Sequence, residues 1–119
     1  MEPRLKSGIW VRALIRRCAV EAVPALVVRK GDETAGGVFV KVNRLDGLAD
    51  VFSPSRRGDG TKVWMRATGE APVSEADADA YVERQAKYDP DIWVIEIEDR
   101  DGRHFLGEEV DLGGGGLMP

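Results

Sequence analysis

The sequence predicts a single α+β domain: a mostly antiparallel sheet of about four to six strands, with two helices packed on one face. Apolar residues near the N-terminus follow a helical spacing, those in the middle of the chain alternate with a period of two, and a second helical stretch lies between residues 75 and 88. The expected order is α-β-β-β-β-α-β, with an optional short strand at the end. Because helices and strands do not alternate regularly, a doubly wound parallel sheet is not expected.

The first helix is expected over residues 8–22. Its inner stripe recurs at the i, i+3, i+4 and i+7 spacing of a helix face and consists of Val11, Leu14, Ile15, Cys18, Ala19 and Ala22. Ser7 is the expected N-cap, since a serine hydroxyl can accept a hydrogen bond from a free backbone N–H of the first turn. Pro24 is expected to end the helix, because its ring disfavours helical geometry at the preceding residue.

Alternating apolar residues predict the strands, which are expected at residues 25–29, 38–43, 48–52, 62–67 and 92–98. Asp46 and Gly47 can adopt the left-handed conformations of a tight hairpin turn between the second and third of these strands. A short returning edge strand could follow at residues 104–106.

The second helix is expected over residues 75–88. Ser74 is its N-cap, and Pro90 stands just beyond its end. Its inner stripe consists of Ala78, Tyr81, Val82, Gln85 and Ala86. Residues 1–106 are therefore expected to form one domain, and residues 107–119 a flexible tail, because the run of glycines at 113–116 would lose much backbone entropy on ordering.

Composition favours a cytoplasmic protein with its own core. The chain has 119 residues, 43% of them hydrophobic, which suits one domain. Cys18 is the only cysteine, so no internal disulfide can form, and this favours a reducing compartment. The N-terminus lacks the apolar core of a signal peptide, and no apolar run approaches the roughly 20 residues of a membrane helix. With a net charge of −4, nucleic-acid binding is not expected without a local basic patch.

No catalytic, cofactor-binding or metal-binding residue is expected. Cys18 lies on the apolar stripe of the first helix, where a buried structural thiol is favoured over a nucleophile. His104, the only histidine, stands beside a predicted surface turn, so a solvated imidazole is expected. One cysteine and one histidine cannot supply a tetrahedral zinc site of cysteine and histidine ligands.

The spacing of Asp99, Asp101 and Glu108 resembles part of a calcium-binding loop. The first ligand position of such a loop would fall on Ile97, and the preceding segment is a predicted strand instead of a helix. A hairpin turn with solvated carboxylates is the favoured interpretation.

Two charged sets give alternatives to a purely structural role. A small enzyme or ligand-binding protein would use an arginine–carboxylate pocket, drawn from Arg29, Asp32, Arg84, Asp89, Asp91 and Glu96. A nucleic-acid accessory protein would use Arg12, Arg16, Arg17, Arg56 and Arg57. The first three of these, on the first helix, could alternatively form a docking patch for an acidic partner or a phosphate. The ordinary interpretation is a solvated helix face for the first three of these arginines, and a structural connection between helix and strand for Asp89 and Asp91.

Three stretches resemble a known family. They are IWVRALIRR at 9–17, RKGD at 29–32 followed by Ala35-Gly36 and a valine-rich strand, and RQ at 84–85 followed by DPDIWVIE at 89–96. Together they resemble a set of short bacterial proteins, mostly alphaproteobacterial, catalogued as domain of unknown function fourteen ninety-one. The resemblance runs over residues 5–106. It implies a soluble bacterial protein and carries no activity, so no catalytic residue is transferred.

The expected function is that of a small non-catalytic protein-interaction module with a protein partner, and a homodimer is one form of it. The predicted sheet has edges, and an exposed edge strand offers unpaired backbone groups to another chain. One further strand or helix from a second copy would cover such an edge.

Overall fold

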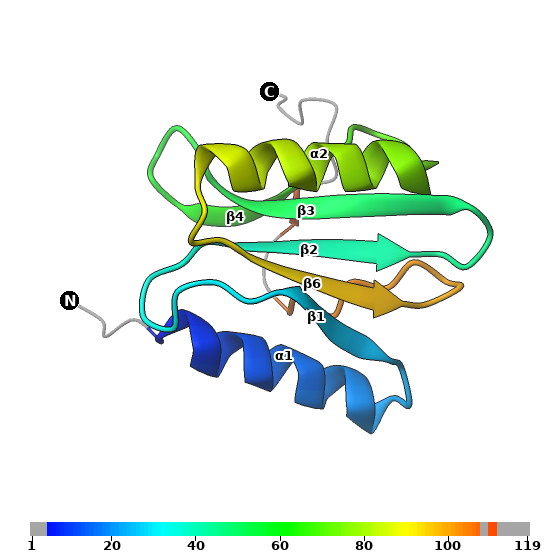
Figure 1. Ribbon diagram of the computed structural model, residues 1–119, viewed down its shortest axis with the longest axis horizontal. Coiled ribbons are helices and arrows are strands. Elements are labelled where there is room, and N and C mark those ends of the chain that lie inside the picture. The colour runs from blue at the N-terminus through cyan, green and yellow to red at the C-terminus, as the bar shows by residue number, and fades with distance from the viewer. Residues whose placement is uncertain (1–4, 108–109, 112–119) are drawn as a thin grey trace.

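In a computed structural model the chain forms one sheet between two helices (Figure 1). The structure describes residues 5–107 and 110–111. The elements, in chain order, are α1 (Ser7–Val20), β1 (Ala25–Arg29), β2 (Val38–Asn43), β3 (Leu48–Arg56), β4 (Lys62–Arg66), β5 (Val73–Ser74), α2 (Glu75–Tyr88), β6 (Trp93–Glu98) and β7 (Val110–Asp111). Neither helix of this described part is long and apolar enough to cross a bilayer.

The strands lie side by side in the order β1-β6-β2-β3-β4-β7, and the short β5 pairs with β3 beside this path. β6, the last long strand of the chain, is inserted between the first two, antiparallel to β1 and parallel to β2. β4 and β7 are also parallel, whereas β2–β3, β3–β4 and β3–β5 are antiparallel. The α+β class and the mostly antiparallel sheet are thus confirmed. The described strands number seven because β5 and β7, of two residues each, join the expected set.

The two helices cover opposite faces of the sheet, so the expectation that both pack on one face is wrong. Leu14 of α1 belongs to a buried cluster with Val40 of β2 and Ile95 of β6. Val82 of α2 belongs to a second cluster with Val51 of β3 and Val94 of β6. Successive strand residues point to opposite faces, and neighbouring residues of β6 are both buried, so each face needs its own cover.

Both ends of α1 differ from the expectation. Ser7 is the first helical residue, not the N-cap, and its hydroxyl donates a 2.6 Å hydrogen bond to the carbonyl of Gly36. The backbone N–H groups of Ser7 and Gly8 donate to carbonyls of Thr34 and Glu33, so the loop after β1 caps the helix in place of a side chain. The helix ends at Val20, because Ala22 adopts a left-handed φ of 59°.

The second helix has the predicted bounds. Ser74 is its N-cap, and the Ser74 hydroxyl accepts a 3.1 Å hydrogen bond from the backbone N–H of Asp77. Ala78 and Val82 of the predicted stripe are buried against the sheet.

No strand forms at residues 104–106, where one was predicted as an option. Phe105 has a left-handed φ of 56°, and the Leu106 N–H donates to Nδ1 of His104 at 3.1 Å, so this segment is a local turn. The chain instead returns to the sheet at β7. The other residues of the predicted flexible tail, 108–109 and 112–119, lie outside the described residues, so that prediction stays untested.

Candidate functional site

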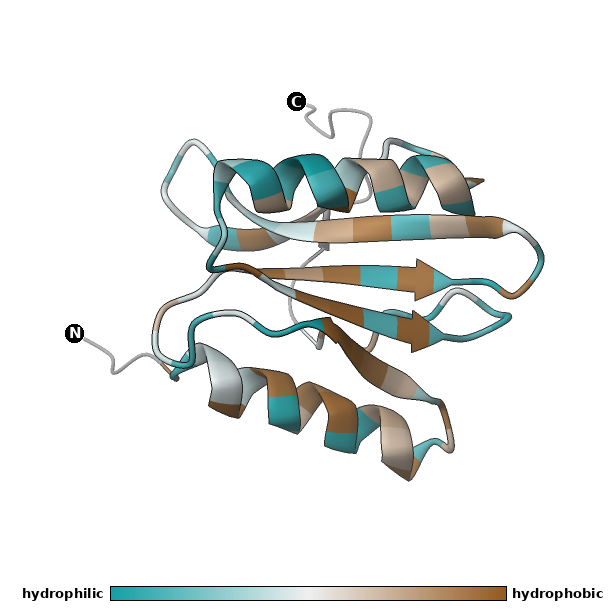
Figure 2. Ribbon diagram, viewed as in Figure 1, coloured by the Kyte–Doolittle hydropathy of each residue, from teal (hydrophilic) through white to brown (hydrophobic). Residues whose placement is uncertain are grey.

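The exposed edge of the sheet is the strand β1. Among the described residues its one strand neighbour is β6, and its side chains Leu26, Val27 and Val28 are 53%, 44% and 58% exposed. Hydropathy colouring shows this edge as a mostly apolar strand next to α1 (Figure 2). Three consecutive exposed apolar residues on an edge strand are a feature that proteins otherwise block with charges, prolines or a covering segment.

The backbone of β1 also has groups directed away from the sheet. The N–H of Glu98 donates a 3.0 Å hydrogen bond to the carbonyl of Pro24, so these two residues form a hydrogen-bonded pair of the β1–β6 ladder. Hydrogen-bonded and non-hydrogen-bonded pairs alternate along an antiparallel ladder. Leu26, opposite Glu96, therefore turns its backbone groups towards β6, whereas Ala25 and Val27 turn theirs to the free side. The pairing register shifts between Val27 and Arg29, which ends this regular stretch.

The opposite edge of the sheet is partly covered by a further strand. There β4 pairs with the two-residue strand β7 through Trp64 and Met65. The first edge is thus an uncovered five-residue strand, and the second is covered over part of its length.

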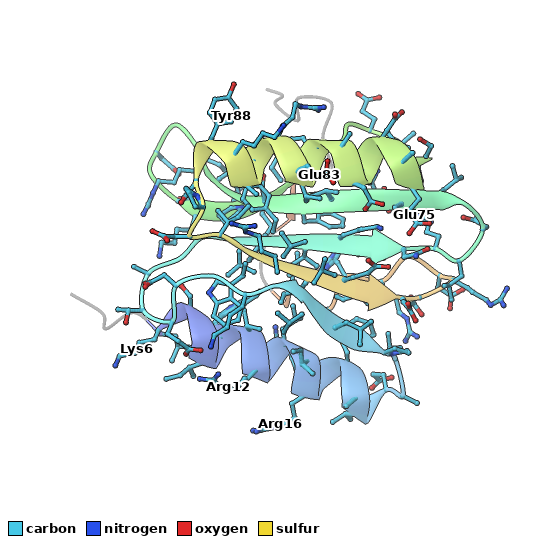
Figure 3. The ribbon with its side chains drawn as sticks, in the orientation of Figure 1. Lys6, Arg12, Arg16, Glu75, Glu83 and Tyr88 are labelled. Carbon is cyan, nitrogen blue, oxygen red and sulfur yellow. The ribbon has the colours of Figure 1, made fainter. Side chains whose placement is uncertain are left out.

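A buried lysine and three carboxylates form a charged cluster beneath α2. The Nζ atom of Lys41, whose side chain is 4% exposed, lies 2.9 Å from an Oε atom of Glu75, 2.7 Å from an Oδ atom of Asp79 and 3.3 Å from an Oε atom of Glu96. The amide of Asn43 donates to Glu75 and Glu96 at 3.1 and 3.0 Å. The cluster joins β2 and β6 to the first turns of α2, and Glu75 is labelled there in Figure 3.

The charge state of Lys41 argues against a chemical role. Burial by itself lowers the pKa of this ammonium, but hydrogen bonds to Asp79 and Glu75 and the charge of Glu96 outweigh burial and raise the pKa above its ordinary value. A lysine acts as a base or nucleophile only when neutral. Lys41 therefore serves as a permanent cation that holds carboxylates from helix and sheet together.

A second buried charge, Asp50, lies on the face covered by α1. Asp50 has no exposed surface, and one of its Oδ atoms lies 3.0 Å from Nε and 2.9 Å from an Nη of Arg44. Its other Oδ atom is 3.5 Å from Nε of Arg66. These two arginines offset the charge of the buried carboxylate, while Oδ1 of Asp50 and Nε of Arg66 are buried without a hydrogen bond among the described residues.

The two residues considered as nucleophile or base both lie in packed surroundings. Cys18 is fully buried, and burial raises the pKa of its thiol, so the reactive thiolate is disfavoured. His104 is half-buried and not solvated as expected, because its ring packs against Phe52 with centroids 5.0 Å apart. Burial, followed by the charge of Arg66, lowers the pKa of His104.

Of the residues proposed for an arginine–carboxylate pocket, Arg29, Asp32, Asp89 and Asp91 lie together where the loop after β1 meets the start of β6. The backbone N–H of Asp32 donates to the carbonyl of Asp91 at 2.9 Å, and a guanidinium N–H of Arg29 donates to the carbonyl of Pro90 at 2.8 Å. Glu96 instead belongs to the Lys41 cluster. Arg84 makes no hydrogen bond or ion pair with any described residue.

The carboxylates of this group are used locally. The Asp32 carboxylate accepts from the N–H groups of Thr34 and Ala35, and that of Asp89 accepts from the N–H of Asp91. Two of the three family-like stretches, 29–36 and 89–96, thus meet at a structural junction between the loop of residues 30–37 and the start of β6.

The basic residues are divided between two elements. On α1, Arg12 pairs with Glu33 at 3.2 Å, and Nε of Arg17 donates to the carbonyl of Phe105 at 3.2 Å. Arg12 and Arg16 point away from the sheet (Figure 3). On the β3–β4 hairpin, Arg56 donates to the carbonyl of Gly60. These contacts are those of a solvated helix face and a turn.

The calcium-like stretch is a turn closed by an ion pair. The Asp99 carboxylate binds the guanidinium of Arg103 through two atoms at 3.0 Å each, and these bonds hold the pKa of Asp99 below its ordinary value. Glu108 lies outside the described residues.

Sequence reasoning missed the buried positions of Lys41, Asn43 and Asp50. The one available signal was the acidic first turn of α2, with Glu75 and Asp79 spaced i, i+4 opposite a lysine in an otherwise apolar strand. This pattern predicts a buried Lys41 only when α2 is already known to cover β2.

Comparison with known proteins adds the family. A family model described as "Protein of unknown function (DUF1491)" matches residues 5–107. The chain belongs to the DUF1491 family. No curated protein gives a significant match.

Solved structures of the family share the fold. A DUF1491 family protein from Caulobacter crescentus CB15, solved by crystallography, is 54% identical, with a TM-score of 0.82, and the match covers 91% of this chain and 100% of that one. Its NMR counterpart is 53% identical with a TM-score of 0.79, covering 92% and 99%. A solution structure of a protein from A. tumefaciens is 29% identical with a TM-score of 0.76, covering 94% and 100%.

Proposed function

We propose that this DUF1491 protein is a small non-catalytic interaction module that binds a protein partner by adding a strand to β1. The observation that carries the proposal is the uncovered edge of β1, where Leu26, Val27 and Val28 are exposed and the backbone groups of Ala25 and Val27 face outward. Backbone hydrogen bonds along such an edge give affinity, and alternate side chains give specificity.

The buried charges Asp50, Asp99 and Lys41 support the same proposal, because each is held in a structural ion pair. The carboxylates of Asp50 and Asp99 are paired with arginines, and Lys41 is held as a cation by three carboxylates. The enzyme alternative required its arginines and carboxylates to act together in a pocket. Arg29, Asp32 and Asp91 instead bond to backbone groups at the loop junction, and Glu96 belongs to the Lys41 cluster. We place the protein in the cytoplasm, where the single buried thiol of Cys18 would stay reduced.

Site-specific photocrosslinking in living cells tests this function. A benzophenone amino acid is placed at position 26 on β1, or at the control position 88 on α2, where Tyr88 is 85% exposed. We expect crosslinked products at position 26 and not at position 88, identified by mass spectrometry.

The same crosslinks should depend on the edge backbone. The Val27→Pro variant removes an outward N–H without touching the bonds to β6, and prolines are tolerated on edge strands in this orientation. Val27→Thr keeps the N–H and the branched shape and is the matched control. Products at position 26 that survive Val27→Pro, or equal products at positions 26 and 88, would contradict strand addition at β1.

A further inference from the structure

We infer that the strand added to β1 is the β1 of a second copy of this chain, paired antiparallel with Leu26 opposite the partner's Leu26. This inference rests on the proposed function and names its partner. A two-fold axis through that pair would join the two sheets into one continuous sheet, an isologous contact in which each copy gives and receives the same bonds.

The outward backbone groups select this register. Ala25 and Val27 each turn an N–H and a carbonyl to the free side, and the register shift after Val27 removes the next position. Antiparallel pairing uses all of these groups only when Ala25 faces the partner's Val27 and Val27 faces the partner's Ala25. Leu26 and the partner's Leu26 then form the central, non-hydrogen-bonded pair. The Cα atoms of such a pair are roughly 4.5 Å apart, and its side chains lie close together.

Charge is distributed along β1 in a way that antiparallel self-pairing satisfies. Glu98 of β6 lies beside the start of β1, level with Pro24, whereas Glu21, which precedes the strand, is already paired with Arg103 at 3.8 Å. Arg29 ends the strand, and the exposed Lys30 follows it.

An antiparallel copy brings the basic end of one strand beside the acidic end of the other, twice across the two-fold axis. A parallel copy would instead bring like charges together. In this register Lys30 of one copy faces Ala22 of the other, one strand away from Glu98, and opposite charges brought near each other across a contact favour association whereas like charges oppose it. Charge complementarity therefore favours a second copy of this chain in the antiparallel direction.

Apolar burial gives the contact its driving force. Leu26 and Val28 are more than half exposed in the single chain, although leucine and valine belong to the residue types most often buried. The Leu26 pair would lose most of its contact with water, and this burial is the main favourable term in protein association.

A disulfide test reads the register directly. In the Leu26→Cys variant two identical positions face each other across the axis, at a separation that a disulfide can span. In the Val28→Cys variant the new thiol faces the partner's Pro24, although position 28 is the more exposed of the two. The native Cys18 is fully buried and does not compete.

Mild oxidation should therefore link Leu26→Cys into a dimer at least about tenfold faster than Val28→Cys, as read on a non-reducing gel. Equal rates, or a faster reaction at position 28, would overturn the register.

A charge-swap experiment tests the partner. Lys30→Glu and Glu98→Lys each place like charges at both ends of the proposed contact, so each variant alone should self-associate at least about tenfold more weakly than the parent chain. Mixing the two restores opposite charges at both ends, and a heterodimer should form. Sedimentation velocity with one variant fluorescently labelled measures both quantities.

The outcomes separate this inference from the proposed function. A parent chain that sediments as a 13.0 kDa monomer at all concentrations would overturn the second copy as partner. Crosslinks from position 26 to a different protein would then still support strand addition. A mixture of the charge variants that stays monomeric while the parent dimerises would overturn the antiparallel arrangement.

Discussion

Gly31 and Gly36 let two chain segments approach more closely than any side chain would allow. A Cβ atom added at either position would lie 2.3 Å from the carbonyl oxygen of Asp91. That carbonyl accepts the N–H of Asp32, and Asp32 in turn accepts the indole N–H of Trp93 at 2.8 Å. The glycines therefore hold the loop after β1 against the start of β6.

Replacing Gly36 with alanine should lower the free energy of unfolding by about 2 kcal/mol or more, because the atoms that a Cβ would meet belong to the backbone and cannot rotate away. Urea unfolding followed by tryptophan fluorescence measures the change. Gly58→Ala is the matched control, since a Cβ there meets nothing within 4 Å. Equal stability of the two variants would contradict the close approach.

His104 should make the stability depend on pH. Burial and Arg66 lower its pKa in the folded state, and Asp50 opposes this effect. The unfolded chain therefore binds a proton more readily than the folded one. The stability linked to His104 is fully present above the unfolded pKa of about 6.5 and falls as the pH drops through that value towards the folded pKa.

The His104→Asn variant isolates this effect. Asparagine does not titrate, and it has an oxygen at the δ position that can accept the N–H of Leu106 as Nδ1 does. Urea unfolding between about pH 7.5 and 5.5 should show a flatter pH dependence for the variant than for the parent chain. Parallel curves would show that another group is responsible.

At the scale of the element, the two helices differ in how locally they are determined. The bounds of α2 could be predicted because Ser74 caps it from the adjacent position and Pro90 follows its end. The start of α1 could not, because its cap consists of carbonyls contributed by Glu33 and Thr34 after the next strand. Its end depends on the left-handed conformation of Ala22, which the sequence does not signal.

The cap of α2 should therefore be measurable by a single change. Ser74→Ala removes the acceptor for the N–H of Asp77 and should lower the free energy of unfolding by about 1 kcal/mol. Ser74→Asn supplies another capping acceptor without adding charge and should retain most of the stability. A loss of the same size in both variants would assign the effect to β5 pairing and not to the cap.

At the scale of the whole molecule, Lys41 joins the sheet to α2. Lys41→Met keeps the length of the side chain but leaves Glu75, Asp79 and Glu96 without their shared cation. Glu75 and Asp79 are 42% and 53% exposed and would be hydrated in the variant, so that of the three carboxylates Glu96 alone stays largely buried without its cation. We therefore expect a loss of about 1–3 kcal/mol in urea unfolding at neutral pH. Lys62→Met, at an exposed position, should stay within about 0.5 kcal/mol of the parent chain.

The elements could be predicted more completely than their arrangement. Period and turn residues indicate strands one at a time, but they do not say that β6 lies between β1 and β2. That insertion decides which faces the helices cover, and it is the reason why Lys41 and Asp50 are buried. The unbroken apolar run of β6, in which the neighbours Val94 and Ile95 are both buried, was a local sign that both faces are covered.

The late position of β6 in the chain also sets the order in which the strands can pair during synthesis on the ribosome. While the ribosome is still adding residues before Trp93, β2, β3 and β4 can already pair, but β1 has no neighbour. The apolar side of α1 then lacks Ile95 and Ile97 beneath it. A nascent chain at this stage exposes apolar surface of the kind that chaperones bind. The sheet is complete only when β6, synthesised late, pairs with β1 and β2, which were synthesised early.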